Sequence, residues 1–237
     1  MTDRLYFRQL LSGRDFATTN HIAKQMVNFV YLVGDRETKE AMIIDPAWGT
    51  QDLVDIIEAD GMNLVGALAT HYHADHVGGS IMGHTVDGIS NLLAIKDVPI
   101  HLQAAEVPWV TRTTGVTAEH IVEHQSGDVV MVGEIPIQLI HTPGHTPGSQ
   151  CFFVDNYLLA GDTLFLEGCG RTDLPGSDPA AMYESLTQKL AQIPDTATLF
   201  PGHLYSPEGS QSMGETREYN YVFKPKSAQQ WMAMFGG

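Results

Sequence analysis

The sequence predicts a two-layered domain that mixes strands and helices. Two observations carry this prediction: segments with strand character outnumber segments with helical periodicity, and short turns join many of the strand segments into hairpins. A parallel doubly wound sheet would instead alternate each strand with a helix. Hydrophobic residues make up 43% of the 237 residues, which is enough to bury a large core.

Short apolar runs bounded by turn residues predict the strands. In order, they are residues 27–33, 41–44, 64–69, 99–102, 129–132, 135–140, 151–154, 157–160 and 198–200. Gly34-Asp35, Gly133-Glu134 and Asp155-Asn156 separate successive runs and suit hairpin turns. The run at 64–69 contains no polar side chain, so we expect it to be a buried strand.

Helical periodicity is found in three segments. They are residues 51–59, 104–110 and 179–192. Ser177 or Asp178 can cap the last of these, and Pro179 suits its first turn. Residues 81–98 are the least regular stretch, where we expect an inserted loop over a cleft, and nothing within 81–125 indicates a role.

No linker or change of composition divides the chain. We therefore expect residues 1–237 to form one domain, with a short tail after about residue 206. The two cysteines, Cys151 and Cys169, are too few for a disulfide framework, and we expect them to be small buried apolar residues.

Charge excludes several classes of partner. The 28 acidic and 13 basic residues give a formal net charge of −15, so phosphate backbones and anionic lipids would repel the chain. No apolar run is long enough to span a membrane, and the first residues lack the pattern of a signal peptide. We expect a cytoplasmic protein that acts on a small molecule and binds neither nucleic acid nor membrane. The sequence leaves the oligomeric state open.

The densest chemical signal directly follows the buried strand at 64–69. It reads His71-Tyr72-His73-Ala74-Asp75-His76. Imidazole and carboxylate groups are good ligands for divalent ions such as zinc. His71 and His73 share parity and can face one ion, whereas Asp75 and His76 lie at the turn onto a following helix and can face another.

Three more strands end on residues that can bind a metal. Residues 135–140 lead to His141 and His145, residues 157–160 lead to Asp162, and residues 198–200 lead to His203. If these strands lie side by side, their ligands meet at one edge of the sheet. The spacing alone does not choose between His141 and His145.

Together these residues fit a site for two ions. One ion would take His71, His73 and His145, the other would take Asp75, His76 and His203, and Asp162 would bridge them. Two ions about 3.5–4 Å apart lower the pKa of a shared water and polarise a carbonyl oxygen. A metal-bound hydroxide is then the expected nucleophile, with Asp75 and Asp162 assigned to catalysis as well as binding. Zinc is the expected metal, and the same ligands accept iron or manganese.

The motif at 71–76 resembles the HxHxDH motif of the metallo-β-lactamase superfamily. The resemblance continues, in the same order, through TPGHTPG at 142–148, AGDT at 160–163 and PGH at 201–203. It covers about residues 27–205 and implies an αββα sandwich, in which two sheets pack face to face with helices outside. It also implies that His145 is a ligand and that His141 is structural.

Within the superfamily, the chain most resembles glyoxalase II, the hydroxyacylglutathione hydrolases. GDTLF at 161–165, GCGR at 168–171 and the tyrosine of GHxY at 205 carry this resemblance. It implies that Arg171 and Tyr205 contact the substrate, a thioester such as S-acylglutathione. Glyoxalase II usually has a longer C-terminal helical domain, for which the residues after His203 are too few.

Three alternatives accompany the hydrolase hypothesis. Residues 170–173 also resemble the GCGRTD segment of persulfide dioxygenases, which use one iron bound by two histidines and one aspartate. The matching positions are His73 or His71, together with His145 and Asp162. The same scaffold could hydrolyse a lactone or β-lactam, or bind metal without catalysis. A thioester hydrolase is preferred because all seven ligand positions are present.

Overall fold

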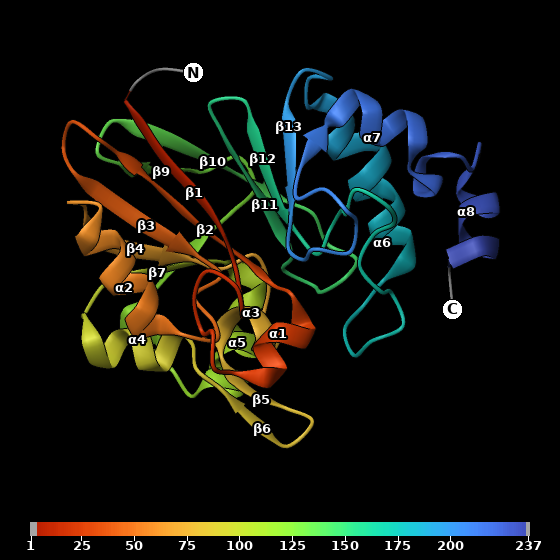
Figure 1. Cartoon of the computed structure of the whole chain (residues 1–237). Coiled ribbons are helices and arrows are strands. Elements are labelled where there is room, and N and C mark those ends of the chain that lie inside the picture. Colours follow the sequence, from red (N-terminus) through yellow and green to blue (C-terminus); the bar gives the residue numbers. More distant parts are fainter. Residues whose placement is uncertain (1–3, 236–237) are drawn as a thin grey trace.

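Two six-stranded sheets face each other in the computed structural model, which describes residues 4–235 (Figure 1). The first sheet, in spatial order, contains β1 (Leu5–Leu11), β2 (Phe29–Asp35), β3 (Glu40–Ile44), β4 (Asn63–Leu68), β7 (Ile100–Gln103) and β8 (Ile121–His124). The second contains β14 (Gln211–Ser212), β13 (Thr198–Pro201), β12 (Tyr157–Gly161), β11 (Gln150–Val154), β10 (Ile135–His141) and β9 (Val129–Val132). A separate hairpin pairs β5 (Gly79–Ile81) with β6 (His84–Val86).

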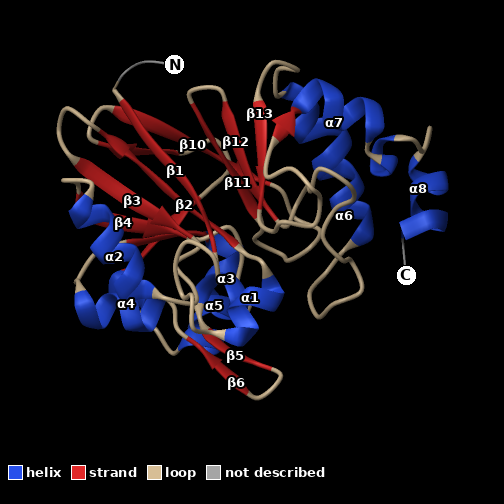
Figure 2. Cartoon of the chain, in the orientation of Figure 1, coloured by secondary structure: helices blue, strands red, loops and turns tan. Residues whose placement is uncertain are grey.

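Helices lie outside both sheets, as Figure 2 shows in blue. The α-helices are α1 (His21–Met26), α2 (Thr50–Ala59), α3 (Ala74–Val77), α4 (Ile89–Ile95), α5 (Val107–Thr114), α6 (Pro179–Glu184), α7 (Met213–Tyr219) and α8 (Ala228–Phe235). Short 3₁₀ segments are η1 (Ala104–Glu106), η2 (Ala118–His120), η4 (Leu190–Gln192) and η5 (Tyr221–Phe223), and η3 (Ser185–Lys189) is a π-helical turn that continues α6. Within the described residues, no helix has the length and apolar character needed to cross a membrane.

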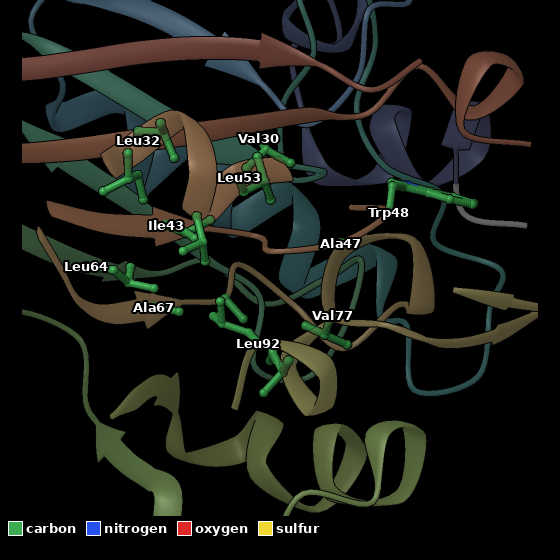
Figure 3. Close-up of a cluster of buried hydrophobic side chains, with 14 of the residues drawn as sticks. Val30, Leu32, Ile43, Ala47, Trp48, Leu53, Leu64, Ala67, Val77 and Leu92 are labelled. Carbon is green, nitrogen blue, oxygen red and sulfur yellow. The ribbon is translucent and has the colours of Figure 1, made fainter. Parts of the chain in front are cut away.

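Three clusters of apolar side chains pack between these layers. The cluster between the sheets joins side chains such as Tyr31 and Ile44 of the first sheet to Leu139 and Phe152 of the second. A second cluster lies between the first sheet and its helices, where Leu53 of α2 and Leu92 of α4 cover the sheet (Figure 3). Burial of each such side chain stabilises the fold by about 1.5–3 kcal/mol.

The third cluster fixes the C-terminal segment. Met182 of α6, Met213 of α7 and Trp231 of α8 pack against the outer face of the second sheet, at Leu158 and Leu199. Helices therefore cover both outer faces, which is the predicted αββα sandwich. The structure confirms this fold class.

Most predicted elements form close to their expected bounds. The prediction of an irregular inserted loop at 81–98 is wrong, because the structure shows regular elements there. The segment contains the second strand of the small hairpin and α4, whose Ile89 and Leu92 are buried. The segment was also expected to lie over a cleft. Only its first residue, Ile81, lines the cleft described below.

Candidate metal centre

All seven side chains predicted as ligands lie at one end of the two sheets. His71 and His73 are in the loop after β4, Asp75 and His76 are on α3, and His145, Asp162 and His203 follow β10, β12 and β13 respectively. Figure 1 shows α3 beneath the ends of these strands. The ligand-type residues therefore come from both sheets and meet where the sheets adjoin.

Six of these side chains form two adjoining clusters, each with ligand atoms within 4.8 Å of one another, and a third such group, His71, His76 and Asp162, joins the two. The first cluster is His71, His73 and His145, in which His73 Nδ1 lies 2.9 Å from His145 Nε2. The second cluster is Asp75, His76 and His203, in which the two Nε2 atoms are 3.2 Å apart. These are the two groups that the sequence predicted for two ions.

Asp162 lies between the two clusters. Its carboxylate oxygens are 3.7 Å from His145 Nε2, 3.5 Å from His76 Nε2 and 3.4 Å from His203 Nε2. The preceding Gly161 has a positive φ of 49°, and an added Cβ there would lie 2.6 Å from Thr70. Glycine therefore allows the chain to turn this carboxylate toward the histidines.

Hydrogen bonds to the other ring nitrogen orient four of the imidazoles. The Nδ1 atom of His76 donates to Asp45 Oδ2 at 2.9 Å, that of His145 to Arg171 O at 2.8 Å, and that of His203 to Met26 O at 2.8 Å. The Thr70 hydroxyl donates to Asp45 and so accepts from Nδ1 of His71. In each case Nδ1 carries a proton and Nε2 faces the cluster.

Two buried atoms without hydrogen-bond partners in the described part of the chain indicate whether the site suits a cation. Nε2 of His71 and Oδ1 of Asp162 are buried and have no hydrogen-bond partner among the described residues. A buried lone pair without a partner is costly, and a bound cation would satisfy both atoms. The His and Asp clusters therefore fit a dimetal site.

The electrostatics of the two clusters differ. Burial lowers the pKa of His71, His73 and His145, that of His73 to about 4, so these imidazoles are neutral at pH 7. Burial also disfavours the charged form of His76, but the carboxylates of Asp162, Asp75 and Asp45 outweigh it and raise the pKa of His76 to about 10. The carboxylates therefore favour a positive charge on His76, whereas burial keeps the imidazoles of the first cluster neutral.

The family comparison follows the same residues. The profile of the Metallo-beta-lactamase superfamily matches residues 24–203, which is most of the chain. The chain is a member of the metallo-beta-lactamase superfamily. The match begins in α1 and ends on the last of the seven predicted ligands, so it spans the whole candidate centre.

Relatives within the superfamily differ in the activities for which they are named. The "Probable polyketide biosynthesis zinc-dependent hydrolase BaeB" of Bacillus velezensis is 29% identical over 197 residues, 83% of this chain and 82% of that protein. The human mitochondrial persulfide dioxygenase ETHE1 is 30% identical over 222 residues, 90% and 80% of the two chains. The hydroxyacylglutathione hydrolase of Shewanella halifaxensis is 31% identical over 182 residues, 76% and 62% of the two chains. These identities are too similar to assign a subfamily.

Solved structures show the same fold. ETHE1 from Myxococcus xanthus has a TM-score of 0.78 at 25% identity and covers 98% of this chain and 90% of its own. TTHA1623, solved in a di-iron-bound form, has a TM-score of 0.66 at 27% identity, with 83% and 96% covered. This neighbour therefore holds two iron ions on the same scaffold.

The remaining predicted residues lie around the centre. A cleft of about 680 Å³ opens over it, and Arg171 and Tyr205 both line this cleft. Tyr205 stacks on His203, with ring centroids 4.6 Å apart, whereas the exposed Arg171 pairs with Asp173 at 2.7 Å. His141 lies outside both clusters, where its Nε2 donates to Pro147 O.

Sequence reasoning missed two residues that support the candidate ligands. Asp45 directly follows the predicted strand 41–44, and it accepts hydrogen bonds from Thr70 and His76. Asn28 lies within the predicted strand 27–33, yet its amide donates to Asp75 Oδ2 at 3.0 Å. An aspartate directly after a buried strand was a signal for Asp45, because the same pattern marked Asp162.

The two thiols should react slowly in the folded chain. Burial raises the pKa of Cys151 to about 11 and that of Cys169, beside the cleft, to about 12. At pH 8 the thiolate, which is the reactive form, is therefore scarce, and alkylation by iodoacetamide should be at least about a hundredfold slower than for a free cysteine. Mass spectrometry before and after unfolding in urea measures both rates. Rapid modification of either thiol in the folded protein would contradict this expectation.

Proposed function

We propose that this chain is a metal-dependent hydrolase that cleaves a thioester such as S-acylglutathione. The observation that carries the proposal is the convergence of seven ligand-type side chains into two adjoining clusters with Asp162 between them. Hydrolase relatives at about 30% identity support it. Two bound divalent ions would supply an activated water and polarise the substrate carbonyl.

The chain's own residues would hold the ions and position the substrate. His71, His73 and His145 would bind one ion, and Asp75, His76 and His203 the other. Asp162 would bridge them, and we propose that Asp75 and Asp162 also take part in catalysis. The fixed imidazole orientations mean that little rearrangement precedes the reaction.

The cleft supplies walls for the rest of the substrate. Its apolar lining includes Met26, Ile81, Phe165, Leu174 and the ring of Tyr205. These side chains suit an acyl group, because they exclude water from apolar atoms. We propose Arg171 and Tyr205 as contacts for the thiol portion, for which Arg171 would have to exchange Asp173 for the substrate. This ion pair is exposed, and water and salt screen such pairs, so Arg171 can exchange one partner for another at little cost.

A second candidate function is persulfide dioxygenation with one iron. The observation that favours it is the similarity to human ETHE1, which covers 90% of this chain. Two histidines and one carboxylate suit Fe(II) and oxygen chemistry. His145, Asp162 and either His71 or His73 would bind the iron, because these side chains adjoin one another.

Metal content and substrate turnover separate the two functions. The full chain is produced with zinc, iron and manganese all supplied, and the ions per chain are counted by elemental analysis. The hydrolase predicts about two ions and turnover of S-acylglutathione, and Arg171→Ala should raise KM more than it lowers kcat.

Other results would reject the thioester proposal. About one iron per chain, with oxygen uptake on glutathione persulfide, would favour the dioxygenase. Two ions with turnover of a lactone or β-lactam but of no thioester would retain a hydrolase and replace its substrate.

A further inference from the structure

Glu106 is a buried carboxylate that no step above uses. Its residue is only 1% exposed, and it ends η1 at the N-cap position of α5. The side chain makes no capping hydrogen bond to that helix. The carboxylate instead points toward two loops that each carry residues of the first cluster.

Three hydrogen bonds join Glu106 to these loops. Oε1 accepts from Tyr72 N at 2.7 Å and from the Thr146 hydroxyl at 2.7 Å, and Oε2 accepts from Gly148 N at 2.6 Å. A Cβ at position 148 would lie 2.6 Å from Oε2, so glycine is needed for this approach. All three donors are uncharged groups.

These contacts are adjacent in sequence to the first cluster alone. Tyr72 lies between His71 and His73, and Thr146 directly follows His145. The second cluster has other supports: Asp45 for His76, Asn28 for Asp75 and Met26 O for His203. Asp45 also reaches His71 through Thr70, so Glu106 is the support that contacts only the loops of the first cluster.

We propose that Glu106 is a positioning residue that ties residues 71–73 to residues 145–148 and so sets the geometry of the first cluster. This inference rests on the proposed two-ion site. One carboxylate holds both loops, so its removal would let His145 move relative to His71 and His73. The affinity for one ion would fall while the affinity for the other is retained.

Cobalt(II) titration of the metal-free full chain tests this inference. Visible absorption reports the coordination of each ion, and elemental analysis after gel filtration counts the ions. Glu106→Gln keeps the shape of the side chain but offers an amide N–H to donors that need an acceptor. We expect this variant to lower the affinity for one ion by about 10–100-fold, as is typical when a residue that orients a ligand is changed. The other affinity should stay within about twofold.

Further variants assign the effect to the first cluster. His203→Ala removes a ligand of the second cluster, so the double variant E106Q/H203A should retain no ion where H203A alone retains one. Thr146→Val keeps the shape and removes one of the three hydrogen bonds, together with the contact of the same hydroxyl to Ser149, and should give a smaller loss of affinity for the same ion. Glu123→Gln, at an exposed position, is the matched control and should bind as the unmodified chain does.

The outcomes are distinct. If E106Q binds both ions with normal affinity, or loses affinity for both ions equally, Glu106 does not act selectively on the first cluster and the inference is wrong. If E106Q fails to fold, Thr146→Val decides in its place, and unchanged affinities there would overturn the inference. An unmodified chain that never binds two ions would instead reject the proposed two-ion site.

Discussion

Replacing Asp162 with alanine is expected to abolish binding of the ion pair and to lower turnover at least about 10³-fold. The carboxylate lies within 3.7 Å of imidazoles from both clusters, so its loss removes a ligand from each. Metal ions stabilise a transition state by several kcal/mol, and each 1.36 kcal/mol corresponds to a tenfold rate. Elemental analysis and kcat/KM measure the two effects.

The matched control is Asp97→Ala. Asp97 is exposed and lies away from the cleft, where it contacts only His120 at 3.2 Å among the described ion pairs. This variant should keep both ions and full activity. If D162A keeps two ions and normal turnover while its circular dichroism is unchanged, the assignment of Asp162 as a bridging ligand is wrong.

Trp231→Ala should lower the free energy of unfolding by about 3–5 kcal/mol, the usual cost of truncating a buried aromatic side chain. Trp231 is fully buried on α8, packs near Tyr183 of α6 and donates to Val222 O at 3.2 Å. Alanine would leave a cavity against the second sheet and a carbonyl without its partner. Urea denaturation followed by fluorescence and circular dichroism measures the change.

A neighbour on the same helix provides the comparison. Met234 is 55% exposed, so Met234→Ala should change stability by no more than about 0.5 kcal/mol. The pair also tests the expected division of the chain into one domain with a short tail after about residue 206. Equal small effects of both substitutions would mean that α8 contributes little to the folded unit.

The candidate ligands could be predicted because each follows a short apolar strand. A strand followed by histidine or aspartate is visible in sequence, and parallel or hairpin pairing brings such ends together, as at His145 and Asp162. Asp45 has the same local pattern, but its partners Thr70 and His76 are 25 and 31 positions away. Its role therefore depends on tertiary contacts that the local pattern does not contain.

The missed elements have physical causes as well. β1 includes Arg8 and Gln9, whose polar side chains interrupt the apolar pattern, and its position is set by pairing with β2. The segment 81–98 contains the end of β5, the three-residue strand β6 and the two-turn helix α4, which are too short for a clear period. The helix predicted at 179–192 was correct in place, but its hydrogen bonding changes to a π turn at Ser185–Lys189.

The distribution of the clusters over both sheets has a consequence for stability. His145, Asp162 and His203 join the four ligand-type residues at 71–76 only when the sheets are assembled, so an unfolded chain offers no complete site. Ions that bind only the native state add RT ln(1 + [L]/Kd) to its stability, about 2.7 kcal/mol when the free ion is a hundredfold above Kd. With the proposed two-ion site, the melting temperature is expected to rise with the free metal concentration, and a chelator is expected to lower it by removing this stabilisation.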